Sequence, residues 1–350
     1  MHMADALLSP AVGGVMWGAT AALVGYSSKK MHDGFESKRV PLMGVLGAFI
    51  FAAQMINFSI PATGSSGHLG GGLILAILLG PYSAFLTIAS VLVVQALFFA
   101  DGGLLALGCN IFNLGFFPCF LAYPLIYKKI VGNSPSSGRI VTGALIAAVV
   151  GLQLGAFGVV LETMASGISE LPFGAFVLLM QPIHLAIGVV EGLVTAAVVV
   201  FVWKARPEIL EVASEPGKSL IGVSLGRVLV VLGIVAVITG GALSWFASAY
   251  PDGLEWSMAG TSGREELDSP EGGIHDSLAA LQERTAFLPD YAFAAGGEEA
   301  APAEGEAVEE EAAWPAVDPG TSVSGLVGGF LVLLMAAGIG MLLKRRVKAA

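Results

Sequence analysis

Long apolar segments separated by short polar connections cover most of the chain. A helix needs about 20 apolar residues to cross a hydrocarbon core of ~30 Å. Nine segments carry this pattern, and most have the required length: 10–27, 41–58, 69–79, 82–99, 104–127, 140–162, 173–203, 227–249 and 322–343. They predict an all-α fold, a polytopic membrane bundle with a seven-helix body and two further C-terminal transmembrane helices.

The third segment is too short to cross a membrane as an ordinary helix. Residues 69–79 rise only ~17 Å at ~1.5 Å per residue. Gly80 and Pro81 then interrupt the helical pattern. We therefore predict a short or re-entrant helix inside the protein, where neighbouring segments satisfy its polar backbone groups.

Basic residues decide the predicted topology, because they concentrate in short cytoplasmic loops. Nine crossings that start outside place on the inner face every basic residue beyond segment 249–321, namely Lys29, Lys30, Lys38, Arg39, Lys128, Lys129, Arg139, Lys204, Arg206, Lys218, Arg227, Lys344, Arg345, Arg346 and Lys348. Counting residues 69–99 as one crossing breaks this pattern. We predict a multi-pass protein of the cell (inner) membrane, with an extracytoplasmic N-terminus and a cytoplasmic C-terminus.

Composition also indicates that lipid is the solvent. Hydrophobic residues make up 55% of the chain and charged residues 13%, with a mean hydropathy of +0.80. A soluble fold of this length does not hide so much apolar surface. Cys109 and Cys119 lie in apolar sequence without CxxC spacing, which favours packing over zinc binding or a disulfide. No nucleic-acid partner is expected.

Acidic residues concentrate in one segment. Residues 249–321 hold 17 of the 27 Asp and Glu residues but only two basic residues, Arg264 and Arg284. Glutamate runs at 298–299 and 309–311 stand among Ala, Gly and Pro, a composition typical of disorder. We predict a largely disordered outer loop that serves either as a solvated linker or as an attractor for cations.

The same pattern divides the chain into parts. Residues 1–206 form the predicted seven-helix body, and 207–226 form a cytoplasmic connector. Residues 227–350 form a pair of transmembrane helices that flank the acidic loop 249–321.

The first two residues have the chemistry of a metal chelate. No Lys or Arg precedes Lys29, so a cleavable signal peptide is not predicted, and the bulky His2 favours retention of Met1. The α-amine of Met1, the backbone nitrogen of His2 and the His2 imidazole can form two fused chelate rings once the amide is deprotonated. This nearly planar set suits Ni(II), Cu(II) or low-spin Co(II), whereas zinc prefers a tetrahedron.

His68 is the candidate for the fourth in-plane donor. It lies in an outer loop rich in glycine, with Gly64 and Gly67 before it and Gly70, Gly71 and Gly72 after it. Glycines permit the close backbone approach that an N-terminal plug beside this loop requires. Taken alone, a histidine at a helix entrance is more often an ordinary hydrogen-bonding residue, and the paired His2 is what favours metal binding.

Other polar residues have two explanations each. Asp5 either supports a ligand or caps a helix that starts near Leu7. His184 and Glu191 are two helical turns apart on one face of a membrane helix, where ionisable groups are either functional or structurally satisfied. His32 reads as a solvated surface residue, and His275, in the acidic segment, has no obvious partner.

The motifs that carry a resemblance are Met1-His-Met-Ala-Asp5, Gly64-Ser-Ser-Gly-His68-Leu-Gly-Gly, Leu78-Leu-Gly-Pro81, Gln95-Ala-Leu-Phe-Phe-Ala-Asp101-Gly-Gly, Leu107-Gly-Cys-Asn110-Ile-Phe-Asn113 and His184-Leu-Ala-Ile-Gly-Val-Val-Glu191-Gly. Together they resemble the CbiM/NikM family, the substrate-binding components of energy-coupling-factor transporters for cobalt and nickel. The resemblance covers residues 1–206. Ala4 and Ala6 stand where the family usually has Pro and Gly.

This resemblance implies a ligand set and a group of supporting residues. The ligands are the α-amine of Met1, the backbone nitrogen and imidazole of His2, and the imidazole of His68. Candidates to support them are Asp5, Asn110, Asn113, His184 and Glu191. The transported substrate is then Ni²⁺ or Co²⁺, and the same four nitrogens serve either ion. Neighbouring genes for cobalamin synthesis, or for urease and hydrogenase, would separate the two.

The C-terminal part has a motif of its own. Pro251-Asp-Gly-Leu-Glu255 follows a membrane helix and is similar to the PDGLE module of the small accessory subunit in the same systems. The chain thus resembles a fused M and N component. The resemblance implies partners, a transmembrane coupling protein and two ABC-type ATPase subunits, and an S-component that tips in the membrane as it releases metal.

The sequence does not supply an ATP site. The nearest approach to a P-loop, Gly217-Lys218-Ser219, has Val212 where the first glycine belongs. We therefore expect a transport component that is not an enzyme and that takes its energy from partners. A small-residue stripe, Gly44, Ala48 and Ala52, either faces the coupling subunit or packs internally.

Two other classes of protein remain alternatives. Gly64-Ser65-Ser66-Gly67 satisfies the GxSG pattern of rhomboid-type intramembrane serine proteases, with His184 as a possible base. The second alternative is an ion-coupled secondary carrier, which should show inverted repeats and buried carboxylates, and the sequence shows neither clearly.

Overall fold

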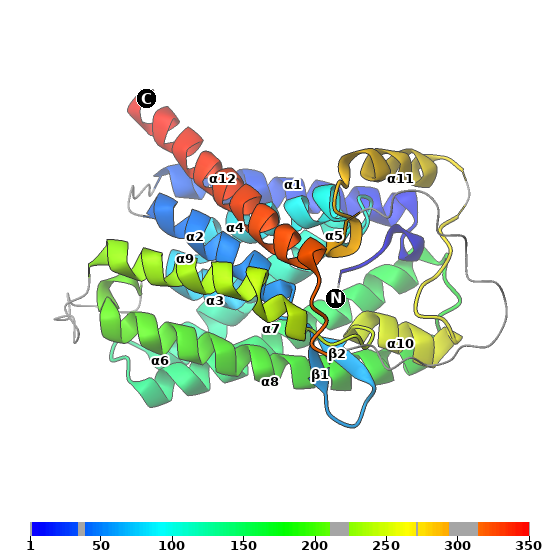
Figure 1. The fold of residues 1–350 in the computed structure, drawn as a ribbon, viewed down its shortest axis with the longest axis horizontal. Coiled ribbons are helices and arrows are strands. Elements are labelled where there is room, and N and C mark those ends of the chain that lie inside the picture. Colours follow the sequence, from blue (N-terminus) through cyan, green and yellow to red (C-terminus); the bar gives the residue numbers. More distant parts are fainter. Residues whose placement is uncertain (1, 34–38, 211–223, 271, 294–313, 350) are drawn as a thin grey trace.

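Helices form nearly all of the regular structure in a computed structural model, which describes residues 2–33, 39–210, 224–270, 272–293 and 314–349 (Figure 1). Each of the nine predicted segments contains a helix. These helices are α1 (Pro10–Asp33), α2 (Arg39–Gln54), α3 (Gly72–Leu79), α4 (Pro81–Phe98), the continuous α5 (Leu107–Ile111), η2 (Phe112–Tyr127) and α6 (Lys128–Val131), α7 (Ser137–Ser166), α8 (Phe173–Ala205), α9 (Leu225–Gly241) and α12 (Pro319–Ala349).

Five of these helices are long and apolar enough to span a membrane: Pro81–Phe98, Leu107–Val131, Ser137–Ser166, Phe173–Ala205 and Pro319–Lys344. Helices α2 and α9 are also apolar but shorter. The prediction of an all-α, polytopic membrane protein is confirmed. The orientation of the chain across the membrane stays a prediction.

Helix α3 is the short internal helix that the sequence predicts. It has only eight residues, and all of them are buried. Gly71 precedes it with φ at +77° and Gly80 follows it with φ at +78°, a backbone conformation that side chains with a Cβ resist. Pro81 then begins α4, where its missing N–H is not needed.

Two features depart from the predicted helices. Residues 55–58 do not continue α2, because β1 (Phe58–Ile60) pairs antiparallel with β2 (Ser65–Gly67), with Ser59 opposite Ser66. The segment η2 has the wider π-type winding and contains Pro118 and Pro124. Each proline removes one backbone donor, and a local change of winding is a common response.

The C-terminal helix pair packs on the body of the protein. Helix α12 runs along α2 and α9. A Cβ added at Gly44 would lie 3.1 Å from the carbonyl oxygen of Leu333, and one at Gly329 would lie 3.8 Å from the Cβ of Ala48. Gly44 and Ala48 therefore pack against α12 inside this chain, which agrees with internal packing, the favoured of the two explanations of the small-residue stripe.

Part of the acidic segment is folded, which contradicts the prediction that it is largely disordered. Helices α10 (Gly253–Ser262) and α11 (Ile274–Thr285) and the 3₁₀ turn η5 (Pro289–Tyr291) all lie within it. An Asp252 and Glu255 capping box starts α10. Tertiary contacts order these helices despite their charge. The glutamate runs at 298–299 and 309–311 lie outside the described residues.

Short elements and helix ends lie at two ends of the molecule. The β1–β2 hairpin, α10 and α11 lie toward one end, and α6 and the C-terminal end of α12 lie at the other (Figure 1). The first group contains segments predicted for the outer face, and the second contains segments predicted for the inner face.

Candidate metal-binding site

The N-terminal segment enters the protein as a plug held by its backbone. The N–H of Met3 donates to Oδ1 of Asn110 at 2.8 Å, and Nδ2 of Asn110 donates to the Met3 carbonyl at 3.2 Å. The N–H of Gly103 donates to the same carbonyl at 3.0 Å. Met3 is fully buried. Asn110 thus fixes the residue that follows His2.

Asp5 ties the plug to a second segment. Its Oδ1 accepts the N–H of Ala106 at 2.9 Å, immediately before α5. A Cβ at Gly103 would overlap this carboxylate, so a glycine is required there. The suggestion that Asp5 caps a helix near Leu7 is wrong, since Asp5 opens only a 3₁₀ turn and the first long helix begins at Pro10.

The His2 imidazole is buried beside a carboxylate. Its Nδ1 lies 2.8 Å from Oδ1 of Asp101, and its side chain is only 8% exposed. The hydroxyl of Tyr291 donates to the other oxygen, Oδ2. Burial alone would raise the pKa of Asp101, but the His2 imidazole and the Tyr291 hydroxyl hold it well below its usual range. Asp101 is therefore an anion next to His2.

His68 stacks on His2. The ring centroids are 5.0 Å apart and the ring planes differ by 12°. Nδ1 of His68 lies 3.1 Å from the carbonyl oxygen of Leu69. A carbonyl only accepts, so Nδ1 carries the proton and Nε2 carries the lone pair that a metal needs. Burial lowers the pKa of His68 to about 3, which keeps the ring neutral.

Glu191 holds the loop that carries His68. Its Oε2 accepts the N–H of Gly70 at 2.8 Å and its Oε1 accepts the N–H of Gly71 at 3.2 Å. Nε2 of Gln54 donates to the Gly70 carbonyl at 2.9 Å. The buried carboxylate of Glu191, in α8, thus holds Gly70 and Gly71 in place. Through them it sets the position of the His68 backbone.

The remaining candidates, His184 and Asn113, are hydrogen-bonded to groups outside the histidine pair, although His184 lines a small pocket with His68 and Asp252. Nδ1 of His184 donates to the Met180 carbonyl at 2.8 Å within α8. Nδ2 of Asn113 donates to Oε2 of Glu162 at 2.7 Å, in α7, and not to the His68 loop. The structure therefore gives Asn110, Asp5 and Glu191 direct supporting contacts, and it gives Asn113 a different partner.

The other two histidines have separate environments. Nδ1 of His32 lies 3.5 Å from Asp33, and its side chain is 32% exposed, as a surface residue would be. His275 is buried, and its Nε2 donates to the Leu8 carbonyl at 2.9 Å. The expectation that His275 has no partner is wrong, because α11 lies against the N-terminal plug.

The arrangement required for a serine protease is not formed by Ser66 and His184. The Ser66 hydroxyl donates to the Tyr250 carbonyl at 2.7 Å, while His184 donates to Met180. Each side chain is thus engaged with a backbone carbonyl and not with the other.

The C-terminal module lies across the His68 loop. The N–H of Ser66 donates to the Pro251 carbonyl at 2.8 Å, and Nε1 of Trp256 donates to the Thr63 carbonyl at 2.9 Å. Oδ2 of Asp252 lies 3.9 Å from Nε2 of His68. Asp101, Asp252 and Tyr291 were not predicted as residues of this site. Asp101 and Asp252 stand in the recognised motifs, but only the tertiary fold shows what they face.

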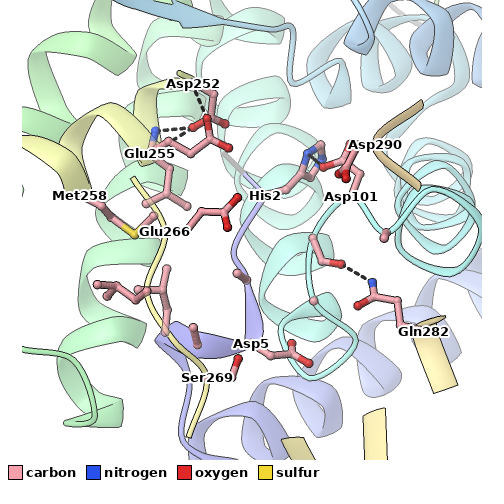
Figure 2. A pocket seen from close by; sticks show the side chains of 18 of the residues that line it. His2, Asp5, Asp101, Asp252, Glu255, Met258, Glu266, Ser269, Gln282 and Asp290 are labelled. Atoms are coloured by element: carbon pink, nitrogen blue, oxygen red, sulfur yellow. Dashed lines mark hydrogen bonds and ion pairs between the residues drawn. The ribbon is translucent and has the colours of Figure 1, made fainter. Parts of the chain in front are cut away.

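An acidic cavity of about 560 Å³ leads to the histidine pair. Figure 2 shows Asp101 and Asp290 beside His2 on one side and Asp252 with Glu255 on the other. The carboxylates that line it are Asp5, Asp101, Asp252, Glu255, Glu266 and Asp290. A cleft lined by one sign of charge raises the local concentration of counter-ions, here cations.

Side chains alone do not complete a metal site. Within the described ranges, no group of three or more His, Cys, Asp and Glu side chains is arranged to hold an ion. The stacked histidines contribute two nitrogens. A four-donor site built around them requires backbone nitrogens as well, which are those of the first two residues in the predicted chelate.

A multi-pass helical membrane protein whose buried histidine pair closes an acidic cavity belongs to the class of metal transport proteins and is not an enzyme. Comparison with known families agrees. Residues 2–209 match the CbiM family, described as the cobalt uptake substrate-specific transmembrane region, and residues 226–345 match the PDGLE domain. The chain belongs to the CbiM family, and the resemblance predicted from its motifs is confirmed.

Two similar proteins are named as fused nickel transport proteins, and a third is named as a cobalt transport protein. A protein of Archaeoglobus fulgidus named as a fused nickel transport protein, NikMN, is 33% identical over 96% of each chain. The fused nickel transport protein NikMN of Rhodobacter capsulatus is 31% identical over 83% of this chain and 88% of its own. The cobalt transport protein CbiM of Geobacter sulfurreducens is 28% identical over 60% of this chain and 61% of its own.

Solved structures give the same class. A truncated transition metal transporter is 30% identical and superposes with a TM-score of 0.52 over 58% of this chain and 99% of its own. A second transition metal transporter, 31% identical, also gives 0.52, over 58% of this chain and 93% of its own.

Proposed function

We propose that this chain is the substrate-binding component of an ATP-driven energy-coupling-factor transporter and captures Ni²⁺ or Co²⁺. The ion is held by the α-amine of Met1, the backbone nitrogen and imidazole of His2, and the imidazole of His68. The observation that carries this proposal is the stacking of His2 on His68, with ring centroids 5.0 Å apart. Relatives named for nickel and cobalt transport support the choice of ion.

The surroundings of both rings favour binding of a cation. His68 is neutral and has its lone pair on Nε2, so no proton competes for that nitrogen. Nδ1 of His2 lies 2.8 Å from Oδ1 of Asp101. When Nδ1 takes the ion, the proton on it moves to Nε2 of the same ring, whereas the α-amine and the amide each give up a proton to solvent. Metal binding therefore releases protons and strengthens as the pH rises. The Asp101 anion then offsets part of the added charge.

The planar geometry limits the choice of ion. Two fused chelate rings constrain three nitrogens to one plane, and His68 fills the fourth position. Ni(II) and low-spin Co(II) accept such a set, whereas zinc loses its preferred tetrahedron. Selection between nickel and cobalt is not determined by these four nitrogens.

Transport requires partners beyond this chain. We propose a transmembrane coupling protein and two ABC-type ATPase subunits, since the sequence has no complete P-loop. In this assignment residues 1–206 are the metal-binding component, 207–226 are a cytoplasmic connector and 227–350 are the fused accessory module. The cavity and the N-terminus face the outside, where the ion arrives.

A four-residue extension before Met1, without histidine and long enough that the new α-amine cannot form a fresh chelate with His2, tests the proposed chelate. It moves the α-amine out of reach of the two rings, so we expect tight Ni²⁺ and Co²⁺ binding to be abolished, as measured by calorimetry on the purified protein in detergent. His68→Ala should weaken binding by ~100-fold or more, because loss of a supporting residue alone typically costs 10–100-fold. His32→Ala is the control and should bind as wild type. Unchanged tight binding by the extended chain would overturn the proposal.

A further inference from the structure

We propose that Asp252, from the C-terminal module, binds the incoming Ni²⁺ or Co²⁺ together with His68 before the N-terminal chelate closes on the ion. This inference rests on the proposed function and adds to it an oxygen donor that lies outside the four-nitrogen set. It gives the C-terminal module a direct chemical role, the transfer of a hydrated divalent ion to the nitrogen donors.

The module is docked on the metal loop by its backbone. Ser66 is the centre of the contact, with its N–H bonded to the Pro251 carbonyl at 2.8 Å and its hydroxyl to the Tyr250 carbonyl at 2.7 Å. The Ser248 N–H donates to the Asn57 carbonyl at 2.7 Å, just before β1. The segment therefore has one register relative to His68, which is two residues after Ser66.

The carboxylate of Asp252 has a fixed direction. Its Oδ1 accepts the N–H groups of Leu254 at 2.7 Å and of Glu255 at 3.0 Å. Oε2 of Glu255 accepts the Asp252 N–H at 2.8 Å, which completes a capping box. Oδ1 is held by the helix N-terminus, and Oδ2 lies on the side of His68, 3.9 Å from its Nε2. The side chain thus does not need to be reordered to meet an ion.

The separation of the two donor atoms fits one ion. Oδ2 of Asp252 and Nε2 of His68 are 3.9 Å apart. A divalent transition metal lies ~2.0–2.1 Å from an imidazole nitrogen and ~2.0–2.2 Å from a carboxylate oxygen, so one ion between them spans up to ~4.3 Å. A slightly bent arrangement therefore places one ion in contact with both atoms without movement of either residue.

The cavity supplies the path to this pair. Asp252, His68 and His2 all line it. Glu255 and Glu266 add further carboxylates (Figure 2). A hydrated ion meets the carboxylates first. Closure of the chelate requires the His2 amide to lose its proton, and Asp252 and His68 hold the ion in place while this occurs. The backbone nitrogens of the first two residues then replace the oxygen.

Asp252→Asn separates this role from helix capping. Asn caps a helix as well as Asp does, so α10 is retained while the anionic oxygen facing His68 is lost. Glu255→Gln is the matched control, since Gln also completes a capping box and the same cavity loses one carboxylate. Asp252→Ser, which also caps, is a second variant in case the first fails to fold. All are measured as full-length protein in detergent.

Stopped-flow mixing with Ni²⁺ and Co²⁺ gives the decisive rates. We expect Asp252→Asn to slow association by roughly tenfold or more, the low end of electrostatic and capture effects on such rates, with dissociation unchanged. Glu255→Gln should slow association by less than Asp252→Asn does, because it removes one charge of the cavity but no oxygen that faces His68. If Asp252→Asn and Asp252→Ser associate like Glu255→Gln, the carboxylate is only a cap and the inference is wrong.

The N-terminally extended chain gives an independent readout. With the chelate blocked, the Asp252 and His68 pair should still hold Co²⁺ weakly, with a visible absorption band that Asp252→Asn removes and Glu255→Gln keeps. Absence of such a band in the extended chain would also overturn the inference. Tight binding by the extended chain would instead refute the chelate itself, so the two failures are distinguishable.

Discussion

Substitution of Glu191 by Gln tests whether the buried carboxylate of α8 sets the position of His68. Both carboxylate oxygens accept backbone N–H groups, at 2.8 Å from Gly70 and 3.2 Å from Gly71. Gln has one carbonyl oxygen and one NH₂ group in their place. One of the two glycine N–H groups would therefore face a donor instead of an acceptor.

The size of the effect follows from these contacts. A hydrogen bond to a charged group contributes ~1.5–3 kcal/mol, and an unsatisfied buried donor costs a similar amount. If the loop must hold this conformation to present His68, a loss of ~1.5–3 kcal/mol weakens metal binding by about 10- to 100-fold. The protein should remain folded, because the long helices do not depend on this contact.

Calorimetry with Ni²⁺ on the purified protein measures the affinity, and a thermal melt of the same sample reports folding. Glu162→Gln is the control: it also neutralises a buried carboxylate in a long helix, but Gln keeps an oxygen for Nδ2 of Asn113. It should bind metal as wild type does. Undiminished Ni²⁺ affinity in a folded Glu191→Gln protein would show that Glu191 does not set the position of His68.

Three further predictions concern other contacts. Tyr291→Phe removes the hydroxyl that donates to Asp101, and the loss of one hydrogen bond to an anion should weaken Ni²⁺ binding by roughly tenfold in calorimetry. Gly325→Leu places a side chain into the backbone of Gly240 and should lower the melting temperature strongly, whereas Gly338→Ala, which meets nothing within 4 Å, should not. The pKa of His68 is about 3 in the folded protein, against 6.5 for an ordinary histidine, so between these pH values only the unfolded chain binds a proton at His68. The stability of the metal-free protein should therefore fall as the pH drops from 6.5 toward 3. His68→Gln should reduce this pH dependence in thermal melts.

Hydrophobic pattern was sufficient to find the apolar helices, but not α10 and α11 in the acidic segment. Segments such as 173–203 and 140–162 are long, continuous and apolar, so their helices α8 and α7 end within a few residues of the predicted bounds. The β1–β2 hairpin was missed because each strand has only three residues. Alternation over three positions gives no usable period.

Only part of the candidate site was predicted, because a local pattern shows residue types but not tertiary contacts. His2 and His68 stand in motifs whose residue types suggest metal chemistry. Asp252 and Tyr291 lie in a segment whose charge predicts disorder, and they reach the site through backbone contacts that no local pattern encodes, such as that of Ser66 with Pro251. The composition of residues 253–262 and 274–291 predicts disorder, but the structure has α10, α11 and η5 there. Packing on the body of the protein outweighs their low hydrophobicity.

Packing among the membrane helices also positions the segment of the C-terminal module that carries Asp252. Helix α12 lies along α2, and α9 crosses α12 at Gly240 and Gly325, where any side chain would separate the backbones. The end of α2 leads into the β1–β2 hairpin, and the end of α9 leads into the segment that carries Asp252. Helices α2, α9 and α12 pack on one another. The distance between His68 and Asp252 therefore depends on how α9 crosses α12. A substitution such as Gly325→Leu should therefore slow metal association as Asp252→Asn does, even though it lies in a membrane helix and contacts neither donor.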